Sequence, residues 1–292
     1  MIRPHTKVSV KDVSKHYNDL DQIYRAVWSD HLHHGLWSEG KETKEEAVRK
    51  LVLKVAELAE IKPNDQVCDV GCGYGATARM LAREFKANVL GLTVSDSQLR
   101  YALSVTDAVT DSVKYQKRDW LENDLDSESF DSVISIESSE HMPNLERFFQ
   151  EAFRVLKPGG SFVICAWLTK DLPSVRDVKY LLEPICSEGR LVGMGTVDDY
   201  CELFSDTGFN NVIHQDLSQS VKKTWSLSIL GLLPHFIKNP KDLRLLSAAI
   251  NPNRNFLASL FRIRLAYETG AMKYGIFRGF KPKLTHSAQK HH

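Results

Sequence analysis

One stretch of this chain decides its fold: Asp69-Val70-Gly71-Cys72-Gly73-Tyr74-Gly75. It follows a short apolar run at 66–70 and precedes a segment at 76–85 whose apolar residues have helical spacing. The predicted order is therefore strand, tight turn and helix. Glycines permit the positive φ of such a turn and leave its backbone open to a ligand. The helix that follows presents free N–H groups, which suit an anionic group such as a carboxylate.

The same alternation of strand and helix continues along the chain. Strands that alternate with helices predict an α/β fold, here a doubly wound, mostly parallel seven-stranded sheet of Rossmann-like type. The expected strands are 66–70, 88–93, 113–117, 130–136, 161–167, 211–217 and 274–280, with a turn at 157–160 before the fifth. The expected helices are 45–60, 76–85, 97–109, 145–156 and 197–204.

The length of 292 residues indicates one α/β core with an added lobe. Residues 45–217 form the predicted core, and residues 1–44 an N-terminal lid. Residues 218–273 are rich in Leu, Ile, Phe and Trp and predict a helical substrate cap of two or three helices, inserted before the last strand. Residues 274–292 hold that strand and a frayed tail. We expect lid and cap to cover the carboxyl edge of the sheet, where ligands of such sheets bind.

The composition indicates a globular protein that acts on a small molecule. A formal net charge of +1 provides no broad basic field, so we expect no nucleic-acid partner. The five cysteines lack paired spacing and the N-terminus lacks a secretory pattern, which favours a cytoplasmic protein with reduced thiols. No apolar run approaches the roughly 20 residues that span a bilayer. The sequence leaves open whether the chain is a monomer or a homodimer.

The glycine spacing separates two classes of nucleotide site. This chain has GxGxG, whereas the dinucleotide fingerprint is GxGxxG with an acid about 20 residues further on. At the end of the second strand, Thr93 stands where that ribose-binding acid is expected. Asp69 ends the first strand and points at the same pocket, where its carboxylate can accept hydrogen bonds from an ammonium group. Alternatively, Asp69 only caps the next helix.

Several motifs together resemble the class I methyltransferases, and within them the γ-tocopherol methyltransferase-like branch. Sterol, sarcosine/dimethylglycine and cyclopropane fatty-acid enzymes share several of these motifs. The lid segment 24–36 and the passage 271–277 also resemble that branch. The motifs are residues 67–75, residues 91–95 with Gln98, residues 137–143 (ESSEHMP) and residues 154–160 (RVLKPGG), in order and at family-like spacing.

The resemblance implies S-adenosylmethionine as the cofactor. Asp69 would lie at its methionine end, and Thr93 at its ribose. Asp119 would accept from the exocyclic amine of the adenine and Trp120 would cover the ring, although simple core packing also explains Trp120. The full expected cofactor site is Asp69, Gly71, Cys72, Gly73, Thr93, Val94, Gln98, Asp119, Trp120, Glu137, Tyr17 and Trp28.

Methyl transfer from a sulfonium is a direct displacement, so the protein mainly aligns the acceptor and excludes water. A phenol, enol or protonated amine must also lose a proton to a base. His141 can take a proton near neutral pH, and Glu140 can orient it or neutralise a developing cation. Alternatively, both residues only fix their loop. The candidate catalytic residues are Glu140, His141, Glu137 and Tyr24.

The lid carries aromatic residues with two interpretations. The faces of Tyr17, Tyr24 and Trp28 would attract a sulfonium. Tyr24 and Trp28 are also spaced as on one face of a helix that packs on the core.

A cluster of three histidines lies in the same segment. A structural metal site usually needs four ligands, and no cysteine pair accompanies these residues, so we expect no metal. Contacts within the lid, or surface positions without a special role, are the alternatives for His31, His33 and His34.

The apolar cap predicts a lipophilic or amphipathic acceptor, such as a phenolic or prenylated aromatic, a terpenoid or an amine. Alternatively, these helices only bury themselves against the sheet. Cyclopropane-type methylene transfer to an acyl chain is the main enzymatic alternative, because Glu140 also fits that pattern. Two alternatives come from other classes: a nicotinamide-dependent dehydrogenase, and a non-catalytic cofactor-binding interaction protein.

Overall fold

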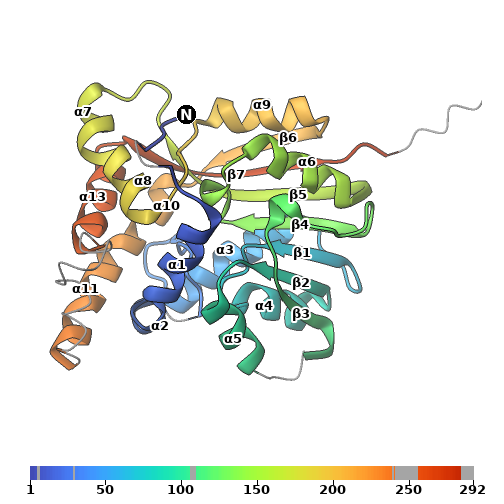
Figure 1. Cartoon of the computed structure of the whole chain (residues 1–292), viewed down its shortest axis with the longest axis horizontal. Coiled ribbons are helices and arrows are strands. Elements are labelled where there is room, and N and C mark those ends of the chain that lie inside the picture. Colours follow the sequence, from blue (N-terminus) through green and yellow to red (C-terminus); the bar gives the residue numbers. More distant parts are fainter. Residues whose placement is uncertain (5–6, 29, 106–109, 239, 241–255, 284–292) are drawn as a thin grey trace, which may run out of the picture.

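A computed structural model describes residues 1–4, 7–28, 30–105, 110–238, 240 and 256–283. Its centre is one seven-stranded sheet in the order β3-β2-β1-β4-β5-β7-β6 (Figure 1). Strands β1 to β5 pair in parallel, while β7 runs antiparallel to both of its neighbours. The predicted doubly wound, mostly parallel sheet is confirmed. The strands are β1 (Gln66–Val70), β2 (Asn88–Thr93), β3 (Val113–Lys117), β4 (Phe130–Ile136), β5 (Leu156–Thr169), β6 (Asn210–Asp216) and β7 (Met272–Phe280).

Helices cover both faces of this sheet and bury two hydrophobic cores. On one face, α3 and α4 pack on β1 and β2. On the other, α6 and α9 bury a phenylalanine-rich core against β4 and β5. Local signals start these helices: the Thr43 hydroxyl accepts from the backbone N–H of Glu46, whose carboxylate accepts from the N–H of Thr43. These helices and α5 are α3 (Lys44–Leu58), α4 (Ala76–Phe85), α5 (Asp96–Ser104), α6 (Leu145–Val155) and α9 (Val197–Thr207).

The described residues of the segments 1–44 and 218–273 lie beyond the carboxyl ends of the strands (Figure 1). Two polar side chains hold α1 on the sheet edge. The Ser14 hydroxyl donates to the carbonyl of Val94 at 2.9 Å, and Asn18 Oδ1 accepts from the hydroxyl of Ser95 and the backbone N–H of Ser97. The lid contains α1 (Val10–Asp19) and α2 (Asp21–Trp28); the cap contains α10 (Ser218–Val221), α11 (Lys223–Lys238) and α13 (Phe256–Glu268).

Two predicted boundaries are wrong. The fifth strand begins at Leu156 and not at 161, because the expected turn at 157–160 lies inside β5. Gly159 has a φ of 84° there, and its N–H donates to the carbonyl of Lys281. The helix expected at 97–109 ends at Ser104, and positions 106–109 lie outside the described residues, as does the tail beyond 283.

We predicted no helix between β5 and α9, yet the chain is helical there. The segments are α7 (Val175–Asp177), a π-helical turn (Val178–Leu182) and α8 (Glu183–Gly189). α8 packs against α13, so this segment extends the cap. Within the described residues, no helix is long and apolar enough to cross a membrane.

The phenylalanine core gives a stability prediction. Phe204 is fully buried on α9, and its ring centre lies 4.9 Å from that of Phe149. We expect Phe204→Ala to lower the free energy of unfolding by about 3–5 kcal/mol, because truncation leaves a cavity among rings that cannot all move. Urea unfolding measures the loss. Leu172→Ala at an exposed position is the control, and equal stability of the two variants would contradict this packing.

Candidate active site

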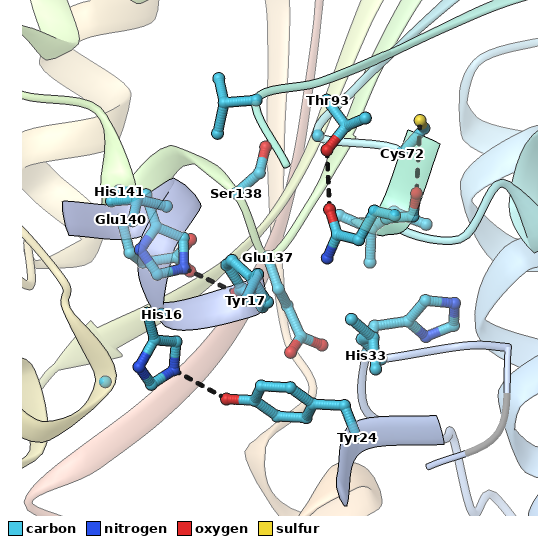
Figure 2. Close-up of a pocket in the computed structure, with 18 of the residues that line it drawn as sticks. His16, Tyr17, Tyr24, His33, Cys72, Thr93, Glu137, Ser138, Glu140 and His141 are labelled. Carbon is cyan, nitrogen blue, oxygen red and sulfur yellow. Dashed lines mark hydrogen bonds between the residues drawn. The ribbon is translucent and has the colours of Figure 1, made fainter. Parts of the chain in front are cut away.

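A single pocket at the carboxyl edge of the sheet collects every residue that we singled out for chemistry or cofactor binding. Its walls come from the lid, from the ends of β1, β2, β4 and β5, and from the cap (Figure 2). The predicted residues that line it are Tyr17, Tyr24, Trp28, Asp69, Gly71, Cys72, Gly73, Thr93, Val94, Gln98, Asp119, Trp120, Glu137, Glu140 and His141.

The three glycines of the turn all have positive φ, but they serve different neighbours. A Cβ on Gly71 would lie 2.3 Å from that of Ser138, and a Cβ on Gly75 would collide with the ring of Tyr115. These two glycines therefore allow close packing within the protein. Gly73 differs, because a Cβ there would meet nothing nearer than Leu32, 3.9 Å away, and would project into the pocket. Our expectation that all three open the backbone to a ligand thus holds for the geometry of Gly73 alone.

Asp69 presents an unsatisfied acceptor to this pocket. The side chain is 2% exposed, and its Oδ2 atom has no hydrogen-bond partner within the described residues. Burial raises the pKa of Asp69 to about 7. An orphaned buried carboxylate beside an open glycine fits a ligand that brings an ammonium group, as the amino-acid end of S-adenosylmethionine does. The residues present therefore fit this cofactor.

Thr93 and Gln98 are linked at the end of β2. The Thr93 hydroxyl donates to Oε1 of Gln98 at 2.7 Å and accepts from the backbone N–H of Ser95. This bond orients the Gln98 amide so that its NH2 group points away from Thr93.

Asp119 and Trp120 follow β3. The Asp119 carboxylate accepts from the N–H of Leu121 at 2.9 Å, and the Trp120 indole donates to the carbonyl of Phe148. Trp120 is buried in the phenylalanine-rich core and also borders the pocket. The packing interpretation is therefore confirmed, while the proposed cover over an adenine stays a prediction.

Glu137 ends β4 with its backbone in the left-handed region, at a φ of 55°. Four hydrogen bonds reach its carboxylate, three of them at Oε1 and one at Oε2. Oε1 accepts from the backbone N–H of His34 at 2.8 Å, from His34 Nδ1 at 2.9 Å and from the Tyr274 hydroxyl at 2.7 Å. Oε2 accepts from the Trp167 indole at 2.9 Å. Burial tends to raise the pKa of Glu137, whereas the charge of His34 and His33 when protonated and the hydrogen bonds from His34 lower it. All four groups around the carboxylate are donors, which favours its ionised form.

Glu140 is a carboxyl group of the opposite kind. The Glu140 side chain is buried, and its Oε1 atom accepts a hydrogen bond from the backbone N–H of Trp167. Burial, together with the charge of Glu137, raises the pKa of Glu140 to about 8. At neutral pH Glu140 is therefore largely uncharged. No hydrogen bond joins it to His141 among the described residues, so the expectation that Glu140 orients this histidine is wrong.

The carbonyl of Arg190 orients His141. It lies 2.9 Å from Nδ1, and because a carbonyl only accepts, Nδ1 carries the proton. Nε2 is then the acceptor for the Tyr17 hydroxyl, which lies 3.0 Å away in the same pocket (Figure 2). Burial lowers the pKa of His141, which keeps the ring neutral at pH 7. His141 is thus a half-buried base with a fixed tautomer and a phenol as its partner.

Comparison with known proteins decides the family. Residues 5–230 match the family described as mycolic acid cyclopropane synthetase. The chain belongs to this family of S-adenosylmethionine-dependent class I methyltransferases. It is 28% identical to the chloroplastic tocopherol O-methyltransferase of Arabidopsis thaliana, over 95% of this chain and 84% of that protein. It is 32% identical to the sterol 24-C-methyltransferase erg-4 of Neurospora crassa, over 76% of this chain and 60% of that protein.

Solved structures share the fold. The mycolic acid cyclopropane synthase CmaA1, crystallised with S-adenosylhomocysteine, superposes with a TM-score of 0.83 at 21% identity, over 94% of this chain and 99% of that one. Its family and its sequence relatives show that this methyltransferase uses S-adenosylmethionine to methylate a small molecule. Family membership decides against the nicotinamide-dependent dehydrogenase.

The lid of the methyltransferase lines its pocket with aromatic side chains. The Tyr24 hydroxyl lies 2.9 Å from Nε2 of His16, a buried lid residue that we did not predict. The Tyr24 ring packs edge-on against Trp28, which in turn contacts Trp225 of α11. The packing interpretation of Tyr24 and Trp28 is confirmed, and both also face the pocket.

The histidine cluster joins the lid to the sheet. His33 and His34 are buried, so the surface interpretation is wrong for both, and a lid contact is correct. His31 Nδ1 lies 3.1 Å from His33 Nε2, and His34 bonds Glu137. Within the described residues, no three metal-ligating side chains converge. The sequence offered no sign of His34's main partner, since Glu137 stands more than a hundred positions away.

Gly73 gives a prediction about cofactor binding. We expect Gly73→Val to abolish binding of S-adenosylhomocysteine, because the branched side chain would fill the pocket beside Asp69. Titration calorimetry measures the affinity. Gly40→Val is the matched control, since Gly40 has a similar positive φ of 77° and open space but lies outside the pocket. If Gly73→Val binds S-adenosylhomocysteine as tightly as the wild type, the cofactor does not bind beside Gly73.

Glu140 gives a prediction about stability and pH. Its pKa of about 8 lies above the usual 4.5, so the unfolded chain releases this proton first and the folded state loses stability as pH rises from 4.5 to 8. Glu140→Gln removes this contribution, so the free energy of unfolding of the variant should fall less between pH 4.5 and pH 8. Urea unfolding at pH 5 and pH 8 compares the slopes, with the exposed Glu146→Gln as control. An unchanged slope in Glu140→Gln would show that this carboxyl is ionised in the folded protein.

Proposed function

We propose that this methyltransferase transfers the methyl group to a lipophilic or amphipathic acceptor, such as a phenolic or prenylated aromatic, a terpenoid or an amine. One observation carries the proposal: the glycine turn opens into a chamber whose far wall is apolar. This wall comes from the lid, from α8 and from the cap helices α11 and α13. Its side chains are Val10, Val13, Ile185, Leu191, Trp225, Leu260 and Ile263.

We place the cofactor along the carboxyl ends of β1 to β3. Asp69 would accept from its ammonium group while Gly73 lets its amino-acid end approach the backbone. The linked pair Thr93 and Gln98 would receive the ribose, and Asp119 with Trp120 would border the adenine. Glu137, Tyr17 and Trp28 would close the site from the sheet centre and the lid. Bound there, S-adenosylmethionine supplies an electrophilic methyl group on a sulfonium.

The chain's own chemistry is proton removal from the acceptor. Tyr17 and His141 both line the pocket and contact each other, and burial raises the pKa of Tyr17 well above its usual value. A free phenolate is therefore unfavourable, so Tyr17 would pass a proton on only as His141 Nε2 accepts one. The Arg190 carbonyl stabilises the imidazolium that results. Glu140, uncharged at neutral pH, would shape the loop, and Tyr24 would position the lid through His16.

The relatives support this class of acceptor. By their names, one methylates tocopherol on oxygen and another methylates a sterol on carbon. Both acceptors are apolar molecules, in keeping with the apolar wall of the chamber. All five cysteines are free thiols, which supports a reducing compartment such as the cytoplasm.

An acceptor screen tests this proposal. Purified protein and cofactor with a labelled methyl group are incubated with phenolic, prenylated, terpenoid, amine and acyl acceptors. We expect label in an apolar acceptor, and less label when Ile263→Asp places a charge in the chamber wall. Label only in highly polar acceptors would contradict the proposed class. Cofactor binding without label in any class would favour the non-catalytic interaction protein.

His141 and Tyr17 give a prediction about turnover. We expect His141→Ala to lower kcat by roughly 10²-fold or more and Tyr17→Phe to lower it as well, with cofactor affinity within a few-fold. The wild-type kcat should fall only below pH 6.5, because burial lowers the pKa of His141 from that value. His141→Ala should lose this acid limb. If the kcat of His141→Ala still falls below pH 6.5 as in the wild type, a residue other than His141 is the base.

Cyclopropane-type methylene transfer is the second candidate, favoured by the family match itself. In that reaction the transferred carbon loses a proton when it closes the ring. A cofactor whose methyl group is fully deuterated separates the two outcomes. A methylated product keeps all of that deuterium, whereas a ring product loses one deuterium to a base. Product mass after incubation with unsaturated acyl chains therefore decides between them.

A further inference from the structure

The hydrogen bonds around Glu137 determine the charge of its neighbours. Trp225 Nε1 lies 2.6 Å from Nε2 of His34. An indole N–H only donates, so this histidine nitrogen accepts, and the proton of His34 sits on Nδ1 facing Glu137. His34 is therefore a neutral ring that donates to a carboxylate. The ion pair suggested by their 2.9 Å separation is a hydrogen bond from a neutral donor.

The next histidine is neutral as well. His33 Nδ1 lies 2.8 Å from the carbonyl of His34, which fixes its proton there, and burial lowers the pKa of His33. The remaining donors to Glu137 are the Tyr274 hydroxyl and the Trp167 indole, which carry no charge. The buried Arg79 pairs with Asp30. Among the described residues, no lysine or arginine contacts Glu137.

Glu137 thus keeps a negative charge that its surroundings solvate but do not neutralise. Two other carboxyl groups of the pocket behave differently, because burial raises the pKa of Asp69 to about 7 and that of Glu140 to about 8. The tyrosines nearby, Tyr17 and Tyr274, have raised pKa values and stay uncharged. Asp30 and Glu188 also line the pocket, but each pairs with an arginine, whereas Glu137 has only uncharged donors around it in the part of the chain that the structure describes.

Holding this charge is costly for the fold. A buried carboxylate without a cation loses much of its hydration energy, and four neutral hydrogen bonds return only part of it. The left-handed backbone of Glu137 adds strain to this cost. In Figure 2 the side chain extends into the middle of the pocket, with Tyr17 on one side and His33 on the other. The charge is therefore directed at the ligand space.

We propose that Glu137 is the fixed counter-charge of the pocket, which attracts the positive sulfonium of the methyl donor and distinguishes it from the neutral product. This inference rests on the proposed placement of the cofactor. Transfer of the methyl group removes the cofactor's sulfonium charge, so S-adenosylhomocysteine loses this attraction and leaves more readily. Glu137 then acts by charge and takes no proton, in contrast to a catalytic base.

Binding of cofactor ligands without acceptor tests the proposal. Titration calorimetry at pH 7 compares S-adenosylmethionine and sinefungin, in which an ammonium replaces the sulfonium, with neutral S-adenosylhomocysteine. We expect Glu137→Gln to lower the preference for the charged ligands on the order of tenfold to a hundredfold, with affinity for S-adenosylhomocysteine within a few-fold. Glu140→Gln is the matched control and should keep the preference, since Glu140 is already largely uncharged at this pH.

A measurement on the unmodified protein guards against misfolding of Glu137→Gln. The wild-type preference should persist at pH 5, where Asp69 and Glu140 are protonated while the four hydrogen-bond donors around Glu137 keep its carboxylate ionised. A preference that vanishes at pH 5, or that survives intact in a folded Glu137→Gln, overturns the proposal. A failed placement of the cofactor gives a different result, namely equal affinity for S-adenosylhomocysteine in Gly73→Val and the wild type.

Discussion

The Ser138 hydroxyl donates to the carbonyl of Val70 at 2.7 Å, and this bond joins the ends of β1 and β4. It requires Gly71, since a Cβ there would overlap the side chain of Ser138. Because the two strand ends lie this close, the glycine turn and the loop that carries Glu137 to His141 open into one pocket. The lid and the cap complete the walls of this pocket.

Much of this arrangement followed from the sequence, because its signals are local. The apolar runs of β1 to β4 are short, bounded by turn residues and spaced as a parallel sheet requires, so their bounds were predicted correctly. The parallel sheet then places Asp69, Thr93, Asp119 and His141 at one edge without further information. The family motifs supplied the cofactor in the same way, since they fall in the turns between these strands.

The rest depends on contacts between distant segments. The neutral state of His34 follows from Trp225, and the orientation of His141 follows from a backbone carbonyl at Arg190. No periodicity or motif reports such pairs. The helices between β5 and α9 were missed for a related reason, because their stability comes from packing on α13 and their sequence holds Pro184 and Gly189. Tertiary packing overrides weak local propensity there.

The cap is inserted into a hairpin. β6 ends at Asp216 and β7 begins at Met272, yet the two strands pair antiparallel side by side. The ends of the inserted segment are therefore held together by the sheet, whatever lies between them, and the entropy of closing a longer or shorter segment changes only slowly with its length. Inserted segments of different length can therefore be accommodated without separating the two strands. Trp225 sets a limit to this freedom, because it also fixes the proton of His34 beside Glu137. The lobe is thus free to vary in length, while this one contact couples its evolution to the methyl-donor half of the pocket.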